Sequence, residues 1–310
     1  MKFLPTTKEE MKSLGWDSID VLLISGDTYL DTSYNGSALV GKWLVEHGFK
    51  VGIIAQPEVD VPDDITRLGE PNLFFAISGG CVDSMVANYT ATKKRRQQDD
   101  FTPGGENNKR PDRAVLVYSN MIRRFFKGTT KKIVISGIES SLRRITHYDY
   151  WTNKLRKPIL FDAKADILSY GMGEMSMLQL ANALKNGEDW QNIRGLCYLS
   201  KEPREDYLSL PSHADCLADK DKFIEAFHTF YLNCDPITAK GLCQKCDDRY
   251  LIQNPPSESY SEEIMDKIYS MEFARDVHPY YKKMGAVRAL DTIKYSVTTH
   301  RGCYGECNFC

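Results

Sequence analysis

Residues 21–31 read VLLISGDTYLD, and this stretch decides the fold class. Its first five residues form a nearly continuous apolar run rather than an alternation of apolar and polar side chains. Such a run is typical of a strand that is buried on both faces of a parallel sheet. The same pattern recurs along the first two hundred residues, and it predicts further strands at residues 51–55, 73–77, 115–118, 133–136, 167–170 and 196–199.

Amphipathic segments lie between these runs and predict helices. Two helical faces are marked by apolar side chains at helical spacing, namely Ala38, Leu39, Trp43 and Leu44, then Met177, Leu178, Ala181 and Leu184. Gly48 and Gly187 follow these segments and predict where the helices end. Strands that alternate with helices predict an α/β fold, with an open, doubly wound and mostly parallel sheet over residues 1–200.

Residues 93–113 interrupt this alternation. They contain KKRR, then two aspartates, a Pro-Gly-Gly and KRPDR, without apolar periodicity. A loop of this length inside a compact domain is usually a lid, a binding loop or disordered. A solvated surface loop is the alternative, and the acidic residues that follow KKRR favour a solvated face for that run.

The pattern changes again after residue 200. Residues 201–290 contain aromatic-rich stretches whose pattern predicts helices. Ser261 is a good N-cap for a helix that carries Glu262 and Glu263 in its first turn. We expect a mostly helical connector here. A strand-like run over residues 293–299 follows, and residues 291–310 are expected to begin a further domain.

Composition limits the class of protein. The chain has 310 residues, 42% hydrophobic and 26% charged, with a net charge of -2. These values indicate an ordinary globular protein and predict no nucleic-acid surface for the whole chain, although a local basic patch is compatible with them. The first residues show no signal peptide and no run is long enough to span a membrane. Nine cysteines without such a signal predict reduced thiols and a cytoplasmic location.

Polar and glycine-rich loops follow four of the predicted strands, at residues 26–31, 78–83, 136–140 and 171–174. Ligands of open α/β sheets bind at the carboxyl ends of the strands. We therefore expect a shared pocket, and Asp27, Gly79, Glu139 and Glu174 should converge in it beside Cys303. The full set of candidates adds Gly80, Gly137, Gly171 and Gly173. The alternative for each loop is a simple strand-to-helix turn.

A dense polar and aromatic cluster occupies residues 143–150. Arg143 and Arg144 are able to hold a phosphate or carboxylate, and His147 is able to act as an acid, a base or a ligand. The same residues are equally compatible with a buried ion-pair network. Sequence alone leaves both interpretations open.

The last fifteen residues, SVTTHRGCYGECNFC, contain Cys303, Cys307 and Cys310 on one short loop. Three thiolates can ligate three irons of a cubane cluster and leave the fourth iron open. Zinc is the alternative, but it needs a fourth ligand. Cys234, Cys243 and Cys246, near His228, are a weaker metal candidate because their spacing is irregular. Cys81, Cys197 and Cys216 read as small buried apolar residues.

Four segments carry a resemblance to a known family: GWDSIDVLLISGDTYLD (15–31), DRAVLVYSN (112–120), GIESSLRRITHYDYW (137–151) and DAKADILSYGMGE (162–174). Together with the cysteine triplet, they resemble the YgiQ-like family of radical S-adenosylmethionine (SAM) proteins. The resemblance implies a 4Fe–4S cluster on the three cysteines, SAM on the open iron with Phe309 near its adenine, and reductive cleavage of SAM to a 5′-deoxyadenosyl radical.

The same resemblance implies that this chain is the amino-terminal half of a longer protein. Its partners would be a carboxy-terminal radical SAM domain, an electron donor for the cluster and an unknown substrate. We expect the chain alone to be inactive, because it would hold only the first strand of the barrel.

Residues 1–200 also resemble the cobalamin-binding-type domain found in many radical SAM enzymes. Tyr29 stands where such domains carry a cobalt-ligating histidine, and Gly171-Met172-Gly173-Glu174 resembles a glycine-rich loop of these domains. A phenol is a poor ligand for cobalt, so weak or no cobalamin binding is expected. A second hypothesis follows, in which the chain is a non-catalytic module that binds a small ligand or a cobalamin-like cofactor.

Overall fold

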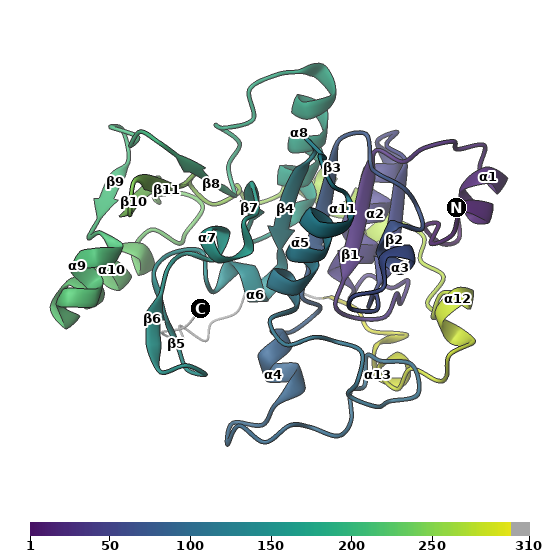
Figure 1. The fold of residues 1–310 in the computed structure, drawn as a ribbon. Coiled ribbons are helices and arrows are strands. Elements are labelled where there is room, and N and C mark those ends of the chain that lie inside the picture. The colour runs from purple at the N-terminus through teal and green to yellow at the C-terminus, as the bar shows by residue number, and fades with distance from the viewer. Residues whose placement is uncertain (299–310) are drawn as a thin grey trace.

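A nine-stranded sheet spans the computed structural model, which describes residues 1–298 (Figure 1). In spatial order the strands are β2 (Val51–Ala55), β1 (Val21–Ser25), β3 (Phe74–Ser78), β4 (Lys132–Ser136), β7 (Ile167–Ser169), β8 (Leu196–Ser200), β11 (Arg249–Gln253), β10 (Leu242–Cys246) and β9 (Leu208–Leu210). The order of the first five shows that the chain adds β2 on one side of β1 and the later strands on the other.

The first five strands pair in parallel, with Leu23 of β1 opposite both Ile53 and Ala76. All five residues of β1 and of β2 are buried, as their continuous apolar runs predict. β8 turns antiparallel to β7, β11 pairs antiparallel with β8 and β10, and β9 is parallel to β10. The predicted α/β class with a mostly parallel sheet is confirmed.

Helices cover both faces of the sheet. One hydrophobic core packs side chains of α3 (Pro62–Thr66), α5 (Ala114–Phe125) and α7 (Ile159–Ala163) on one face, and Figure 1 shows α5 in front of the strands. A second core lies on the other face, under α2 (Gly36–Glu46), α8 (Gly173–Asn186) and α11 (Glu262–Ser270). The two predicted apolar helix faces belong to α2 and α8.

Shorter elements complete the fold. They are α1 (Lys8–Ser13), α4 (Ser84–Asn88), α6 (Gly137–Ser141), the hairpin of β5 (His147–Asp149) and β6 (Lys154–Arg156), α9 (His213–Ala218), α10 (Lys220–Tyr231), α12 (Pro279–Lys282) and α13 (Ala289–Ile293). Gly187 has φ +70° and ends α8 in the left-handed region, as its position predicted. Among residues 1–298, no helix combines the length and the apolar character needed to cross a lipid bilayer.

The strand predicted at residues 115–118 is wrong, because this stretch lies inside α5. Ala114, Tyr118 and Met121 are buried at helical spacing, whereas Leu116 and Val117 are only half-buried. Four successive apolar residues do not distinguish a strand from a buried helix. The continuation to Phe125 shows the helical period.

The prediction of a mostly helical segment over residues 201–290 is wrong in its middle part. β9, β10 and β11 arise there and extend the main sheet beyond β8, so the sheet continues across residue 200. The strand expected at residues 293–299 is also corrected, since Ile293 ends α13. The amides of Lys294 and Ser296 donate locally, to Leu290 and Ile293, and not to a neighbouring strand. Thr299 and the three cysteines of the triplet lie outside the described residues.

The last described segment returns to the opposite edge of the sheet. The amide of His278 donates to the carbonyl of Tyr29 at 3.0 Å, and Leu30 forms a β-bridge with Val277. The hydroxyl of Tyr281 accepts from the amide of Ala55 at 2.7 Å. Residues 271–293 therefore form a strap that ties the end of the described chain to β1 and β2.

Candidate functional site

The ends of β1 and β3 meet at the point where the strand order reverses, which is where open α/β sheets bind their ligands. The two backbones approach closely there, and the amide of Gly26 donates to the carbonyl of Ser78 at 2.9 Å. A Cβ atom on Gly26 would overlap the carbonyl of Gly79. Glycine at position 26 is therefore a requirement of this close contact.

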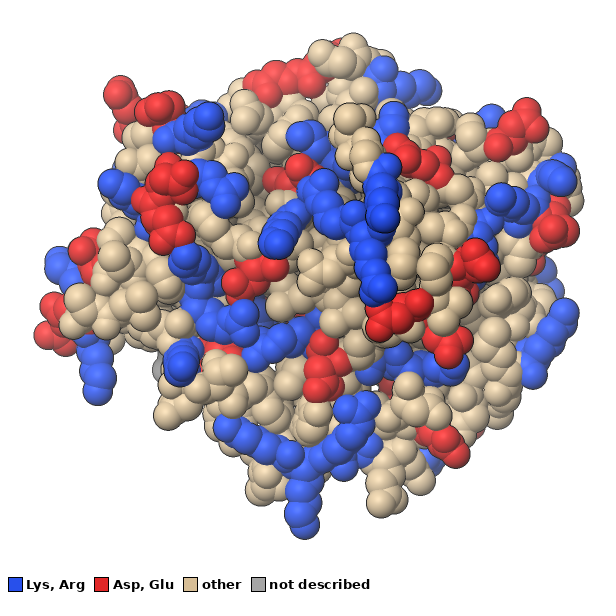
Figure 2. All heavy atoms as spheres, viewed as in Figure 1, with Lys and Arg blue, Asp and Glu red and all other residues tan. Residues whose placement is uncertain are grey.

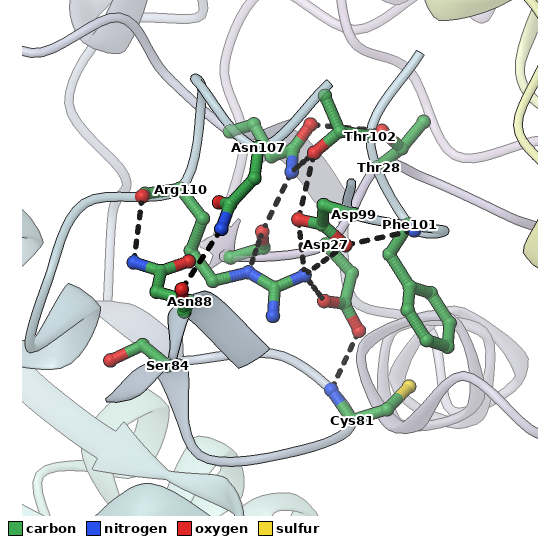
Figure 3. A network of polar contacts seen from close by, with 12 residues as sticks. Asp27, Thr28, Cys81, Ser84, Asn88, Asp99, Phe101, Thr102, Asn107 and Arg110 are labelled. Atoms are coloured by element: carbon green, nitrogen blue, oxygen red, sulfur yellow. Dashed lines mark hydrogen bonds and ion pairs between the residues drawn. The ribbon is translucent and has the colours of Figure 1, made fainter. Parts of the chain in front are cut away.

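A buried ion-pair network fills the space beside this contact (Figure 3). Nη2 of Arg110 lies 2.6 Å from Oδ1 of Asp27 and 3.1 Å from Oδ2 of Asp99. Nε of Arg110 donates to the carbonyl of Gly26 at 3.0 Å, and the amide of Cys81 donates to Asp27 at 2.6 Å. Burial raises the pKa of Asp27, while the charge of Arg110 lowers it. Asp27 is thus engaged inside the protein and is not presented to a ligand.

The loop over residues 93–113 has two parts with different roles. Residues 93–98 are exposed, but Asp99, Thr102 and Arg110 are buried against the end of β1. Gln56 links the two sides, because its Nε2 donates to both the carbonyl of Gly26 and Oγ1 of Thr102. The loop is therefore more than a solvated surface segment: its second part covers the switch point.

Glu139 holds two helix N-termini together. Its Oε2 accepts from the amide of Ser84 at 2.9 Å, and its Oε1 accepts from the amide of Val115 at 3.1 Å. These amides belong to the first turns of α4 and α5 and would otherwise lack a partner. Burial raises the pKa of Glu139, and the nearby charge of Asp83 raises it further. Helix capping explains this carboxylate better than ligand binding does.

An open cleft of about 430 Å³ lies at the ends of β3, β4 and β7, between the N-terminal turns of α2 and α8. Its walls are mainly small or hydroxyl-bearing residues, including Ser37, Ser78, Ser136, Gly137, Ser169, Gly171 and Gly173. Glu174 supplies a carboxylate, which accepts a hydrogen bond from the hydroxyl of Tyr260 at 3.1 Å. Small walls allow a ligand to approach the backbone, and hydroxyls offer both donors and acceptors.

The predicted pocket residues therefore separate into two groups. Gly137, Gly171, Gly173 and Glu174 line the open cleft. Asp27 and Glu139 lie at neighbouring strand ends but face internal partners, and Gly79 and Gly80 pack against these two carboxylates. The expectation that Asp27, Gly79, Glu139 and Glu174 share one cleft is wrong, because only Glu174 of the four lines it. Asp27 and Glu139 are buried with internal partners, since burying a carboxylate without a partner is too costly. The position relative to Cys303 lies outside the described residues.

Arg143 and Arg144 also have internal partners. Arg143 forms an ion pair with Asp83 and donates to the carbonyl of Glu139 at 2.9 Å. The guanidinium of Arg144 lies 4.7 Å from the ring centroid of Tyr170 and 4.3 Å from that of Phe230. These contacts favour the buried network over a clamp for an anion.

His147 is mostly buried, and its Nδ1 lies 3.1 Å from the carbonyl oxygen of Ile145. Burial lowers the pKa of His147 to about 4, although the hydrogen bond to Ile145 acts in the other direction. The neighbouring Asp149 is buried, and its Oδ2 lies 2.8 Å from Nη2 of Arg113. Burial tends to raise the pKa of Asp149, but hydrogen bonds from Arg113 and Thr152 lower it to about 2.

Tyr29 points into the core and not into the crevice. It is fully buried, its hydroxyl donates to Asp31 at 2.8 Å, and it accepts from the amide of Leu4 at 3.0 Å. Its ring stacks on His278 with centroids 5.5 Å apart. Burial and then the charge of Asp31 raise the pKa of Tyr29 far above its usual range. This residue is not placed to ligate a metal at the strand ends.

The weaker cysteine candidate finds no support in the described part of the chain. Among residues 1–298, no group of three or more His, Cys, Asp or Glu side chains is arranged to hold a metal ion. Cys243 and Cys246 are buried in β10, and burial raises the pKa of Cys246 to about 12. A thiol of such high pKa is a poor thiolate donor.

Sequence patterns did not identify three residues that are central to this site: Arg110, Asp99 and Gln56. Each lies in a loop, where no periodicity marks a buried position. For Asp99 and Arg110 the one signal was the length of the loop over residues 93–113, which is typical of a lid or binding loop; no signal marked Gln56. Its buried partners could not be identified from the sequence.

Comparisons with known proteins bear on the whole chain. A family model described as Radical SAM N-terminal matches residues 3–296. A UPF0313 protein of Fusobacterium nucleatum is 96% identical over 310 residues, which are 100% of this chain and 55% of that protein. A UPF0313 protein of Thermotoga neapolitana is 50% identical over 311 residues, covering 99% of this chain and 54% of that protein. The chain thus spans about half the length of these relatives.

Solved structures show a more distant likeness. A radical S-adenosylmethionine methyltransferase, TsrM, from Kitasatospora setae, solved with cobalamin and a [4Fe-4S] cluster bound, aligns with a TM-score of 0.37 and 16% identity. The alignment covers 58% of this chain and 27% of that one.

Proposed function

Because the chain belongs to the Radical SAM N-terminal family, we propose that it forms the amino-terminal part of a radical SAM protein that binds a 4Fe–4S cluster. One observation carries this proposal. The family match ends at residue 296, and the triplet of Cys303, Cys307 and Cys310 begins seven residues later. The length of the relatives supports a carboxy-terminal domain beyond the triplet.

The donor set fits such a cluster. Three thiolates with spacings of three and two residues satisfy three irons and leave one for another ligand. The bound cluster, once reduced by an electron donor, would supply the electron that cleaves SAM. The protein's own contribution is to hold the cluster, to orient SAM with Phe309 beside the adenine, and to exclude water from the site.

The α/β half contributes the open cleft at the ends of β3, β4 and β7. One residue that lines this cleft is Thr298, five residues before Cys303. We assign to this cleft the role of enclosing part of the substrate. A location in the cytoplasm, where thiols stay reduced, is consistent with this role.

The test uses the longer protein after anaerobic reconstitution with iron and sulfide. Replacement of one ligand, Cys307→Ala, is expected to abolish the visible absorption of the cluster and lower the bound iron, because no nearby thiol replaces it. Cys81→Ala is the matched control, since Cys81 is a free, half-buried cysteine in another part of the chain. Equal spectra for the wild-type protein and Cys307→Ala would reject the cluster assignment.

A second measurement concerns catalysis. The longer protein is expected to form 5′-deoxyadenosine from SAM, whereas this 310-residue chain is expected to form none. A barrel's active site is built from the ends of many strands, and this chain spans only about half the length of its relatives. Formation of 5′-deoxyadenosine by the reconstituted 310-residue chain would contradict the expectation that this chain alone is inactive.

The cleft also supports a second candidate function, a module that binds a small ligand without its own catalysis. Glycines and hydroxyls at the carboxyl edge of a parallel sheet are the observation that favours it. For cobalamin we expect weak or no binding, because Tyr29 is committed to the core. Titration of this chain with cobalamin, followed by absorption, tests this expectation, and a tight complex would contradict it.

A further inference from the structure

Two segments far apart in the sequence meet on the surface, at the same edge of the sheet. One is the start of the long loop after β3 and α4, with Lys93 and Lys94; the other is the β5–β6 hairpin after β4. Nζ of Lys93 donates to the carbonyl of Tyr150 at 3.0 Å and lies 4.5 Å from the centroid of its ring. The hydroxyl of Tyr150 donates to the carbonyl of Ala91 at 2.8 Å. We name the surface formed by Tyr89, Lys93, Lys94, Arg95, Arg96, Tyr148, Tyr150, Trp151 and Lys154 the basic–aromatic patch.

The charge of this patch differs from that of the whole chain. The patch itself contains five Lys or Arg side chains and no acidic one, although Arg95 lies 3.5 Å from Asp112 at its border, in a chain of net charge -2. Asp99 and Asp149 are buried beside Arg110 and Arg113, so these acids do not face the solvent. Figure 2 shows Lys and Arg side chains gathering on the lower part of the molecule, around α4 and the loop that follows it.

Tyr148 and Tyr150 of the patch are exposed, Tyr89 and Trp151 are half-buried, and contacts hold their rings in place. Tyr148 of β5 is 51% exposed, and Tyr150, in the turn that follows β5, is 49% exposed. The hydroxyl of Tyr148 donates to Oδ1 of Asn153 at 2.8 Å. The rings of Tyr89 and Trp151 lie 5.2 Å apart and join the loop to the hairpin. Rings fixed in this way lose little freedom when a flat ligand stacks on them.

We propose that the basic–aromatic patch binds single-stranded nucleic acid. Lysine and arginine neutralise the phosphates, while exposed aromatic rings stack on unpaired bases, and the two together are the recognition mode of single-strand-binding surfaces. The patch follows the ends of β3 and β4, the same edge that carries the open cleft. This inference does not rest on the cluster chemistry proposed above.

The experiment titrates the 310-residue chain into fluorescently labelled probes and follows their anisotropy. The probes are a 20-nucleotide single-stranded RNA, a single-stranded DNA of the same sequence, and a duplex. We expect the single strands to bind more tightly than the duplex, and the RNA and DNA arms show whether the sugar matters. The triple variant Lys93→Ala/Lys94→Ala/Arg96→Ala should weaken binding at least about tenfold and reduce the slope of log affinity against log salt by about 2, at roughly 0.7 per phosphate contact. Tyr148→Ala should weaken binding about tenfold, and Tyr148→Phe should restore it.

The matched control is Lys12→Ala/Lys127→Ala/Lys220→Ala, which removes the same charge from exposed positions elsewhere in the chain. It should leave affinity within about twofold of the wild-type chain. Equal weakening by both triple variants, or no binding by the wild-type chain, would overturn the proposal. The longer relative from Fusobacterium nucleatum provides the last measurement. Retained binding there supports the proposal, whereas its loss would assign the patch to an interface with the rest of that protein.

Discussion

The guanidinium of Arg110 and the carboxylate of Asp27 lie 2.6 Å apart, although 83 residues separate them in the chain. Neither side chain is more than 1% exposed. This pair joins the long loop to the end of β1, and it occupies the point of the sheet where a ligand would be expected. The open cleft on the other side of β3 is therefore the better candidate for binding.

Removal of Arg110 should be strongly destabilising. Arg110→Ala would leave Asp27 and Asp99 buried without their cation, which typically costs about 3–5 kcal/mol in the free energy of unfolding. Urea denaturation followed by circular dichroism measures this change. Arg96→Ala, an exposed arginine on the same loop, should change the free energy by less than about 0.5 kcal/mol. Similar values for the two variants would show that the pair is not important for stability.

Gly26 should tolerate no side chain. In Gly26→Ala the new Cβ would overlap the backbone carbonyl of Gly79, which cannot move without disturbing β3. We expect a loss of roughly 1–3 kcal/mol or more, as for other overpacked positions. Gly36→Ala is the control, because a Cβ there meets no atom within 4 Å. Thermal unfolding of both variants compares them directly, and equal midpoints would refute the close contact.

His147 should make stability depend on pH. Its pKa is about 4 in the folded protein, below the ordinary value of 6.5, because burial disfavours the charged ring. The unfolded chain therefore binds the proton first as pH falls through 6.5. The free energy of unfolding should decrease from pH 6.5 to pH 4, by on the order of 3 kcal/mol, and change no further from this group below pH 4.

The measurement is denaturant unfolding of the wild-type chain and His147→Gln across pH 4 to 7. The variant should lose the part of the pH dependence that belongs to this ring. His228→Gln, at an exposed position of α10, serves as the control and should keep the wild-type slope. Parallel pH curves for the wild-type chain and His147→Gln would contradict the buried, neutral histidine.

Local patterns in the sequence were sufficient for much of the fold. The continuous apolar runs of β1, β2 and β4 identify buried parallel strands, since each run reports burial on both faces. The faces of α2 and α8 follow from helical periodicity in the same way. The spacing of Cys303, Cys307 and Cys310 also needs no structure to suggest three ligands for one cluster.

Contacts between distant segments were decided only by the tertiary structure. The short apolar run around residue 115 is compatible with either a strand or a helix, and packing against the sheet favours the helix α5. The strands β9, β10 and β11 exist because β8 offers an edge with which β11 can pair. Neither choice depends on nearest neighbours in the chain.

The same holds for the polar residues. Acidic residues at strand ends suggested a shared pocket, but a buried carboxylate needs a hydrogen-bond donor. In the structure Arg110 pairs with Asp27, and two helix amides donate to Glu139. The KKRR run is exposed, as expected for a solvated face, but only the fold shows that Lys93 contacts Tyr150. Periodicity records which side of an element is buried. It does not record which distant side chain will satisfy a charge, because that depends on how the chain closes upon itself.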